Sequence, residues 1–332
     1  MISLPDLAAL VLLLGLVMYA VFGGADFGGG IWTALAFGPR RQEQRERLFQ
    51  AIGPVWETNH VWLVLVVVTL FTAFPSAFAT LFTALYAPFV AILIGITFRG
   101  AAFAYRHFGE QARSRLPATV HVFAVSSLLT PLTMGLAVAA VAAGRIQLND
   151  GRVEADVWSS WITPFTAMGG LTGVAVCGFL TPVFMAARTR GPLQEDFRRA
   201  GLVAALVLGI ITTAALLVAA LDAPDFAERL LHPGVAGIVA LAVLLGCGTL
   251  VSLWTRRYRI AQVAAGGAVA ATIAGFGAAM YPYLVLGTLT VDQAAAPPTT
   301  LSAFLGALPA GALILVPSLT LLYWTFRGEP LR

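Results

Sequence analysis

Long apolar runs constrain this 332-residue chain more than any other feature of its sequence. A helix needs about 20 apolar residues to cross the hydrocarbon core of a bilayer. Nine runs of that kind lie between charged or Pro/Gly-rich boundaries, at residues 7–37, 49–72, 77–98, 117–143, 158–187, 200–221, 233–254, 260–289 and 302–326. Because the apolar residues are continuous rather than alternating, they predict helices and not the strands of a membrane barrel.

The composition supports an integral membrane protein. Hydrophobic residues make up 59% of the chain and charged residues 11%, whereas soluble domains are about a quarter charged. The basic residues are spread over several short clusters, which argues against a nucleic-acid-binding surface. The two cysteines both lie in apolar runs, and this excludes a disulfide framework or a multi-cysteine metal site. We expect no metal site in this chain.

The positions of the arginines predict the orientation. All 20 basic residues are arginine; 17 of them follow odd-numbered spans and three follow even-numbered spans. Arg99 counts among the 17, as a residue of the loop after the third span. Basic residues are enriched in cytoplasmic loops, so we expect the N-terminus outside and the C-terminus in the cytoplasm. An even number of spans would break this alternation.

A weak internal repeat predicts how the spans are grouped. The Ala-Asp-Phe-Gly-Gly-Gly sequence at 25–30 has a small-residue counterpart at 169–173, in the fifth span. Small residues allow helices to approach closely. We predict an all-α integral membrane protein with two parallel four-helix repeats and one peripheral helix. The expected units are 1–145, with an acidic hairpin, 146–292, and 293–332, with the ninth helix and a cytoplasmic tail.

Two acidic residues, Asp26 and Glu57, are the ones expected to be charged between the caps of these spans. A carboxylate at that depth costs about 2.5 to 3.5 kcal/mol on insertion scales. Both residues are predicted in the cytoplasmic half, within one helical turn of each other in depth. His60 shares the helix face of Glu57 at a spacing of three residues, and Asn59 lies beside it.

This cluster has two interpretations. Burial disfavours the charged form of a carboxyl group, so such an acid can gain and lose a proton near neutral pH. Asp26, Glu57, His60 and Asn59 would then carry protons inward from the cytoplasm. Alternatively, the acids are protonated and hydrogen-bond one helix to another, or Arg99 neutralises one of them. The second half has no such acid, which favours the first hairpin as the functional one.

Two motifs in the first hairpin identify a family. Gly-Ala-Asp-Phe-Gly-Gly-Gly at 24–30 and Ala-Ile-Gly-Pro-Val-Trp-Glu-Thr-Asn-His-Val-Trp at 51–62 resemble subunit II of the cytochrome bd quinol oxidases. The run at 98–106 is similar to that family's end of the third span. The resemblance implies a nine-helix subunit of an enzyme of the bacterial cytoplasmic membrane that oxidises quinol and reduces O2 to water.

The same resemblance implies partners and cofactors. Haems b and d belong to a haem-bearing subunit I, on which this chain packs, and proton uptake from inside makes the reaction electrogenic without a pump. Asp26 and Glu57 match the family's acids, and Trp56 and Arg99 are expected near the partner's haem or quinone region. Where many relatives have an acid, this chain has Ala104, which leaves more of the proton path to Asp26 and Glu57. A structural quinone and a small single-helix accessory subunit are further expectations.

Two other functions are compatible with an acid inside the membrane. A proton-coupled secondary transporter also uses acids near the membrane centre, but this sequence has no substrate-sized set of polar residues. A purely structural membrane subunit would keep the acids without cycling protons. A co-purifying larger subunit with haem absorption bands would distinguish the oxidase from the transporter.

Overall fold

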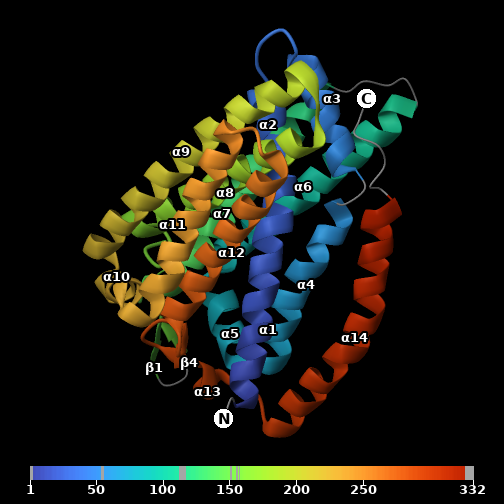
Figure 1. Cartoon of the computed structure of the whole chain (residues 1–332). Coiled ribbons are helices and arrows are strands. Elements are labelled where there is room, and N and C mark those ends of the chain that lie inside the picture. Colours follow the sequence, from blue (N-terminus) through green and yellow to red (C-terminus); the bar gives the residue numbers. More distant parts are fainter. Residues whose placement is uncertain are drawn as a thin grey trace.

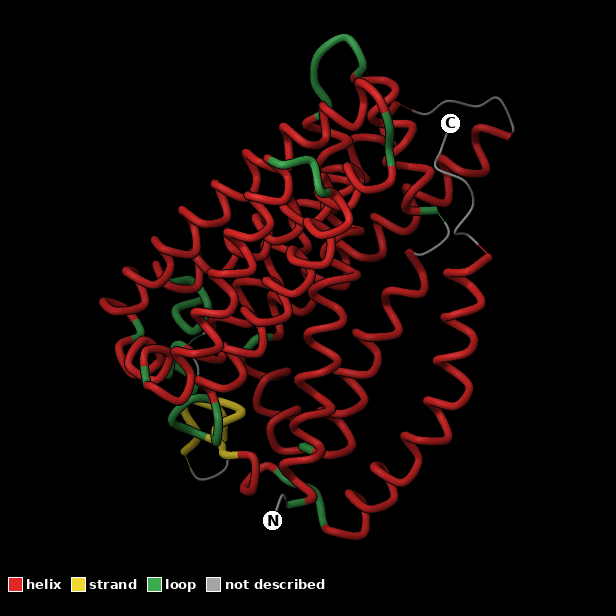
Figure 2. The backbone as a smooth tube through the Cα atoms, in the orientation of Figure 1, coloured by secondary structure: helices red, strands yellow, loops and turns green. Residues whose placement is uncertain are grey.

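The computed structural model describes residues 3–53, 56–111, 117–149, 152–154, 156 and 158–325. Most of these residues are helical, and the long helices run along one another in an elongated bundle (Figure 1). Strands are confined to two short hairpins at one end of the bundle (Figure 2). The predicted all-α membrane fold is confirmed.

Eight helical stretches in the described part of the chain are long and apolar enough to cross a membrane. They are α1 (Leu4–Met18) continued through the π-helix η1 (Tyr19–Gly23) into α2 (Gly24–Leu35), α6 (Tyr86–Gln111), α7 (Pro117–Ala142), α8 (Pro164–Arg188), α9 (Gly191–Asp222), α11 (Pro233–Trp254), α12 (Tyr258–Met280) and α14 (Pro298–Thr325). A ninth span exists if α3 (Arg41–Ile52) and α4 (Trp56–Ala73) count as one bent unit with 53° between them.

The predicted third span, 77–98, is not one continuous helix, and neither of its predicted ends coincides with the end of a helix. The structure divides it into α5 (Pro75–Ala84) and α6, with a break at Leu85. Proline has no N–H to donate, and its ring clashes with the carbonyl four residues earlier. Pro88 therefore prevents one helix from continuing through Ala84. Because α6 extends to Gln111, Arg99 lies inside this helix and not in the loop that follows it.

Prolines also explain two other errors. The predicted eighth span reaches residue 289, but α12 ends at Met280, two residues before Pro282, and the antiparallel strands β3 (Tyr283–Val285) and β4 (Leu289–Thr290) follow. The predicted second span begins at residue 49, whereas α3 ends at Ile52 and α4 begins after Pro54. Proline removes the hydrogen bond that a continuous helix needs at such a position.

The arginine-rich turns meet at one end of the bundle. Arg40 donates to Asp196 over 2.6 Å, and Arg256 lies 3.7 Å from Glu195, so the turns after α2, α8 and α11 are neighbours. We call this the arginine-rich end. The opposite end holds the strand pair β1 (Gln147–Asn149) and β2 (Arg152–Glu154), β3 and β4, and the short helices α10 (Pro224–Leu231) and α13 (Val291–Ala294) (Figure 1).

The peripheral helix predicted for the C-terminal region is α14. It lies at the edge of the bundle, where it packs on α1 and α4 (Figure 1). The division of the chain at residues 145 and 292 stays a prediction. The two units predicted on either side of residue 145 are in contact, since α8 packs on both α7 and α2.

Glycines allow the close contacts of α8 with α2 and α7. A Cβ on Gly28 of α2 would overlap the Cys177 carbonyl and the Thr181 hydroxyl of α8. Gly169 and Gly173 of α8 lie in the same way against backbone atoms of α7. The predicted role of these small residues in close helix approach is confirmed. They join the two halves of the chain along one continuous seam.

Replacing Gly28 with alanine should destabilise this seam. The added methyl group has to displace backbone of α8, and overpacking of this kind typically costs about 1–3 kcal/mol. Gly209→Ala is the matched control, because nothing lies within 4 Å of a Cβ at that position of α9. We expect a lower melting temperature in detergent for Gly28→Ala and an unchanged or higher one for Gly209→Ala. Equal melting temperatures would contradict the close contact.

Candidate functional site

The π-helix η1 interrupts the first span just before the acidic motif. A π turn inserts one extra residue into a helix and is found frequently at functional sites. One residue corresponds to a rotation of about 100° around the helix axis. The face that α2 presents to the interior therefore does not continue the register of α1. Asp26 lies on that interior face, with its side chain 2% exposed.

Asp26 forms a buried ion pair with Arg99 of α6. The guanidinium Nη2 donates to the Asp26 carboxylate over 2.8 Å and to the Asp26 carbonyl over 3.1 Å. Its Nε donates to the hydroxyl of Ser127, on α7, over 3.1 Å. The guanidinium also lies 4.8 Å and 5.0 Å from the ring centres of Phe27 and Phe123. The pair thus connects α2, α6 and α7.

This pair matches one alternative that the sequence leaves open, in which Arg99 neutralises Asp26; whether Asp26 also carries protons stays a prediction. Arg99 is 1% exposed inside the chain, so the interior has a cation that the count of only two charged residues missed. The sequence does contain a signal for the burial of Arg99. Gly95, Arg99 and Ala102 follow one another at spacings of four and three, which places them on one face of a helix, and this face of α6 is buried. The Asp26 Oδ2 atom is buried and has no hydrogen-bond partner in the described part of the chain.

Glu57 lies elsewhere than predicted. It occupies the first turn of α4 instead of a position about two turns inside a span, because the helix begins only at Trp56. Its side chain is exposed on the surface of the chain. Asn59 is buried at 3% exposure and His60 is half-buried. The charges of Asp26, Arg99 and Glu57 all act on His60.

The other two predicted site residues are Trp56 and Arg99. The side chain of Trp56 lies outside the described residues. Arg99 contacts residues of its own chain, as described above, and its expected place near a partner's haem or quinone stays a prediction. Ala104 is half-buried on α6. A methyl group there cannot exchange protons.

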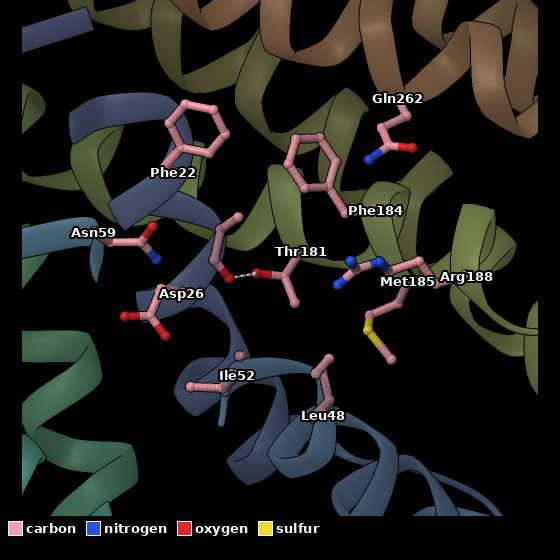
Figure 3. Close-up of a pocket in the computed structure, with 13 residues that line it drawn as sticks. Phe22, Asp26, Leu48, Ile52, Asn59, Thr181, Phe184, Met185, Arg188 and Gln262 are labelled. Carbon is pink, nitrogen blue, oxygen red and sulfur yellow. Dashed lines mark hydrogen bonds between the residues drawn. The ribbon is translucent and has the colours of Figure 1, made fainter. Parts of the chain in front are cut away.

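A cavity of about 240 Å³ reaches Asp26 from the seam between the two halves. Figure 3 shows Asp26 and Asn59 on one side of it and Arg188 and Gln262 on the other. The Thr181 hydroxyl, between them, donates to the Ala25 carbonyl over 2.6 Å. The remaining walls are mainly apolar side chains, from Phe22, Leu48, Ile52, Phe184 and Met185.

The cavity extends toward the arginine-rich end and suits water. Arg188 is the last residue of α8 and is exposed there. Sites that enclose drug-sized ligands usually have volumes of about 300–1,000 Å³, whereas one water molecule occupies about 30 Å³ of the liquid. Several water molecules therefore fit. Three polar residues of the cavity come from the second half of the chain: Thr181, Arg188 and Gln262. Sequence analysis missed these residues because only the packing of α8 and α12 brings them to Asp26.

Comparison with known proteins decides the family. The family model of "Cytochrome bd terminal oxidase subunit II" matches residues 4–326. The chain belongs to this family. It is 28% identical to the cytochrome bd ubiquinol oxidase subunit 2 of Bacillus subtilis over 291 residues, which cover 87% of this chain and 84% of that protein. It is 30% identical to the cytochrome bd-I ubiquinol oxidase subunit 2 of Escherichia coli over 200 residues, 59% of this chain and about half (51%) of that relative.

A solved structure supports the fold of this subunit II family member. The chain superposes on a chain of the bd oxidase from Geobacillus thermodenitrificans with a TM-score of 0.83 and 23% sequence identity. The superposition covers 97% of this chain and 98% of that one. At this identity, the similarity establishes the shared fold.

Removing the charge of Arg99 should damage the subunit far more than removing that of a surface arginine. Breaking one partner of a buried ion pair costs about 3–5 kcal/mol, whereas an exposed pair contributes about 1 kcal/mol or less. We expect Arg99→Gln to lower the melting temperature and the yield of assembled protein. Arg40→Gln is the control, since Arg40 also pairs with an aspartate but is 39% exposed. Similar losses in both variants would contradict a structural role for the buried pair.

Proposed function

We propose that this chain acts as subunit II of a membrane-bound oxidase that oxidises quinol and reduces O2 to water. In this proposal it packs on a haem-bearing subunit I and brings protons to it from the cytoplasm. One observation carries the proton path: Asp26, whose Oδ2 atom has no hydrogen-bond partner among the described residues, lines a water-sized cavity that extends toward the arginine-rich end. The family match supports the oxidase and not the secondary transporter.

Asp26 and Arg99 have complementary roles in this path. The guanidinium holds Oδ1 of Asp26 and balances its charge, so the carboxylate remains fixed at the end of the cavity. Oδ2 is left to accept hydrogen bonds from water and to attract a proton that arrives through it. Asn59 lines the same cavity and offers an amide that both donates and accepts. His60 is the next titratable group toward Glu57.

Glu57 would pass the proton to the partner subunit. A carboxylate at the lipid face of a helix is costly, which favours a protein neighbour for this exposed side chain. Exposed apolar residues continue from Glu57 along α4 at alternating spacings of four and three: Val61, Val64, Val68 and Phe71. Such spacing forms one stripe on a helix and is typical of a helix-packing surface. We assign this stripe to the contact with subunit I.

We assign the haems to the partner subunit because the family resemblance implies it. Among the residues that the structure describes, no group of three or more His, Cys, Asp or Glu could hold a metal ion. The cavity at Asp26 is also small for a haem or quinone. When bound in the partner, haems b and d would supply electron transfer and O2 reduction. A quinone in this chain and a single-helix accessory subunit stay predictions.

The proposed orientation places the arginine-rich end in the cytoplasm, as the positive-inside rule requires. Protons for water formation then come from the side of the cavity, while quinol releases its protons outside. Each elementary charge moved across the membrane is equivalent to about 2.3 kcal/mol per 100 mV. The reaction conserves energy in this way without a pump.

Neutralising the two acids should slow the enzyme without dismantling it. We expect Asp26→Asn and Glu57→Gln each to reduce quinol-driven O2 consumption several-fold, because neither amide can accept and release a proton. Asp26→Asn leaves the Arg99 charge unpaired and should lower the melting temperature, but the asparagine side-chain oxygen and the main-chain carbonyl still accept from Arg99, so we expect the complex to assemble. The measurement is the O2 consumption rate per haem, determined from the reduced-minus-oxidised spectrum.

Glu154→Gln is the matched control, because Glu154 lies on β2 at the opposite end of the bundle. Its turnover should equal that of the unmodified complex. If both Asp26→Asn and Glu57→Gln retained full turnover and full charge movement, the acids would be structural and the proton path would be wrong.

Cysteine labelling tests the orientation. In a Cys247→Ser background, Asn149→Cys places a thiol on β1 and Arg190→Cys places one at the arginine-rich end; both native side chains are exposed. The remaining cysteine, Cys177, is buried. In intact cells a membrane-impermeant maleimide should label position 149 and not position 190, and both after lysis. The reverse pattern would invert the proposed topology.

A further inference from the structure

Three buried polar atoms remain without a hydrogen-bond partner: the Tyr19 hydroxyl, the Asp26 Oδ2 and the His60 Nδ1. They form the complete set of such side-chain atoms in the part of the chain that the structure describes. Tyr19 is 8% exposed and belongs to the π-helix η1. Tyr19 precedes the acidic motif at 24–30, and the proton path proposed above does not use it.

These three side chains belong to one cluster, although they come from η1, α2 and α4. The ring centres of Tyr19 and His60 lie 6.1 Å apart. The ring of Phe27 adjoins both, at 6.5 Å from Tyr19 and 6.4 Å from His60. The charge of Asp26 acts on both Tyr19 and His60. Phe27 connects the three residues, since its ring adjoins those of Tyr19 and His60 and it directly follows Asp26 on α2.

The donor and acceptor types of the three atoms favour water as their hydrogen-bond partner. Most buried polar atoms in folded proteins have a hydrogen-bond partner, from the protein or from ordered water. A carboxylate oxygen only accepts, whereas a phenol donates and accepts and an imidazole nitrogen does either. One water molecule bridges two groups up to about 5.6 Å apart, through two hydrogen bonds of about 2.8 Å each. Water satisfies all three atoms, since it supplies both donors and acceptors.

We infer that Tyr19, Asp26 and His60 form a buried binding site for ordered water, and that Tyr19 is its positioning residue. This inference rests on the proposed function, because the site links the cavity at Asp26 to His60 and so to α4. The π turn orients the Tyr19 ring toward His60, and its hydroxyl holds the water in place. The other charged or titratable groups that act on the cluster are Arg99 from α6, Cys177 from α8 and Glu57 from α4.

High-resolution cryo-electron microscopy of the complete oxidase complex tests the site directly. We expect density for at least one water molecule at about 2.7–3.2 Å from the Tyr19 hydroxyl and from Asp26 Oδ2 or His60 Nδ1. The same density should be lost in Tyr19→Phe. A direct hydrogen bond between the Tyr19 hydroxyl and His60, or a cluster without water density, would overturn the inference.

Kinetics and infrared spectroscopy of Tyr19→Phe test its function. We expect O2 consumption per haem to fall about 3–10-fold at saturating quinol, with an unchanged KM for quinol. The carboxylate band of Asp26, identified by its loss in Asp26→Asn, should shift in Tyr19→Phe, because its water partner is displaced. Tyr283→Phe is the matched control, since Tyr283 is half-buried in the hairpin at the opposite end.

The outcomes separate this inference from the proposed function. Unchanged turnover and an unshifted Asp26 band in Tyr19→Phe, together with a slow Asp26→Asn, would refute the water site and leave the proton path intact. Full turnover in Asp26→Asn and Glu57→Gln would instead refute the path, whatever Tyr19→Phe does. If Tyr19→Phe fails to assemble, His60→Gln provides the second test, and it should show the same loss of water density and the same slow turnover.

Discussion

The ion pair between Asp26 and Arg99 is the constraint on which the interior of this subunit depends. Two opposite charges with side chains 2% and 1% exposed are tolerated only when each is paired and hydrogen-bonded. Their partners fix the relative positions of α2, α6 and α7, because Arg99 reaches Asp26 on one helix and Ser127 on another. The π-helix η1 is part of the same arrangement, since it sets the face that α2 turns toward Arg99.

The seam between the two halves provides what the ion pair alone lacks, a cavity with room for water. Gly28 allows α2 to approach α8 closely, and the same approach brings Thr181 beside Asp26. The buried acid of the second half, Asp196, pairs with Arg40 at the arginine-rich end, and this half supplies three of the polar residues that line the cavity at Asp26. The first hairpin therefore contains the acids of the proposed path, and the packing of the second half completes the cavity beside Asp26.

Sequence reasoning predicted what depends on local chemistry. Continuous apolar runs gave the membrane class, and the span at 233–254 has the same bounds as α11. Errors occurred where a proline decides the end of a helix, as at Pro88 and Pro282. The burial of Arg99 inside a helix was not predicted, because a positive charge at the end of an apolar run is typical of a loop. The spacing of Gly95, Arg99 and Ala102 indicates a buried face of α6, but the pairing with Asp26, 73 residues away, depends on tertiary packing.

The geometry also explains how a paired carboxylate can still take part in proton transfer. Arg99 occupies only Oδ1 and the main-chain carbonyl of Asp26, so the second carboxylate oxygen keeps its lone pairs free for water. A proton beside Oδ2 is attracted by the carboxylate and repelled by the guanidinium on its far side. The pair that holds the helices together is for this reason compatible with a transient proton at the same carboxyl group.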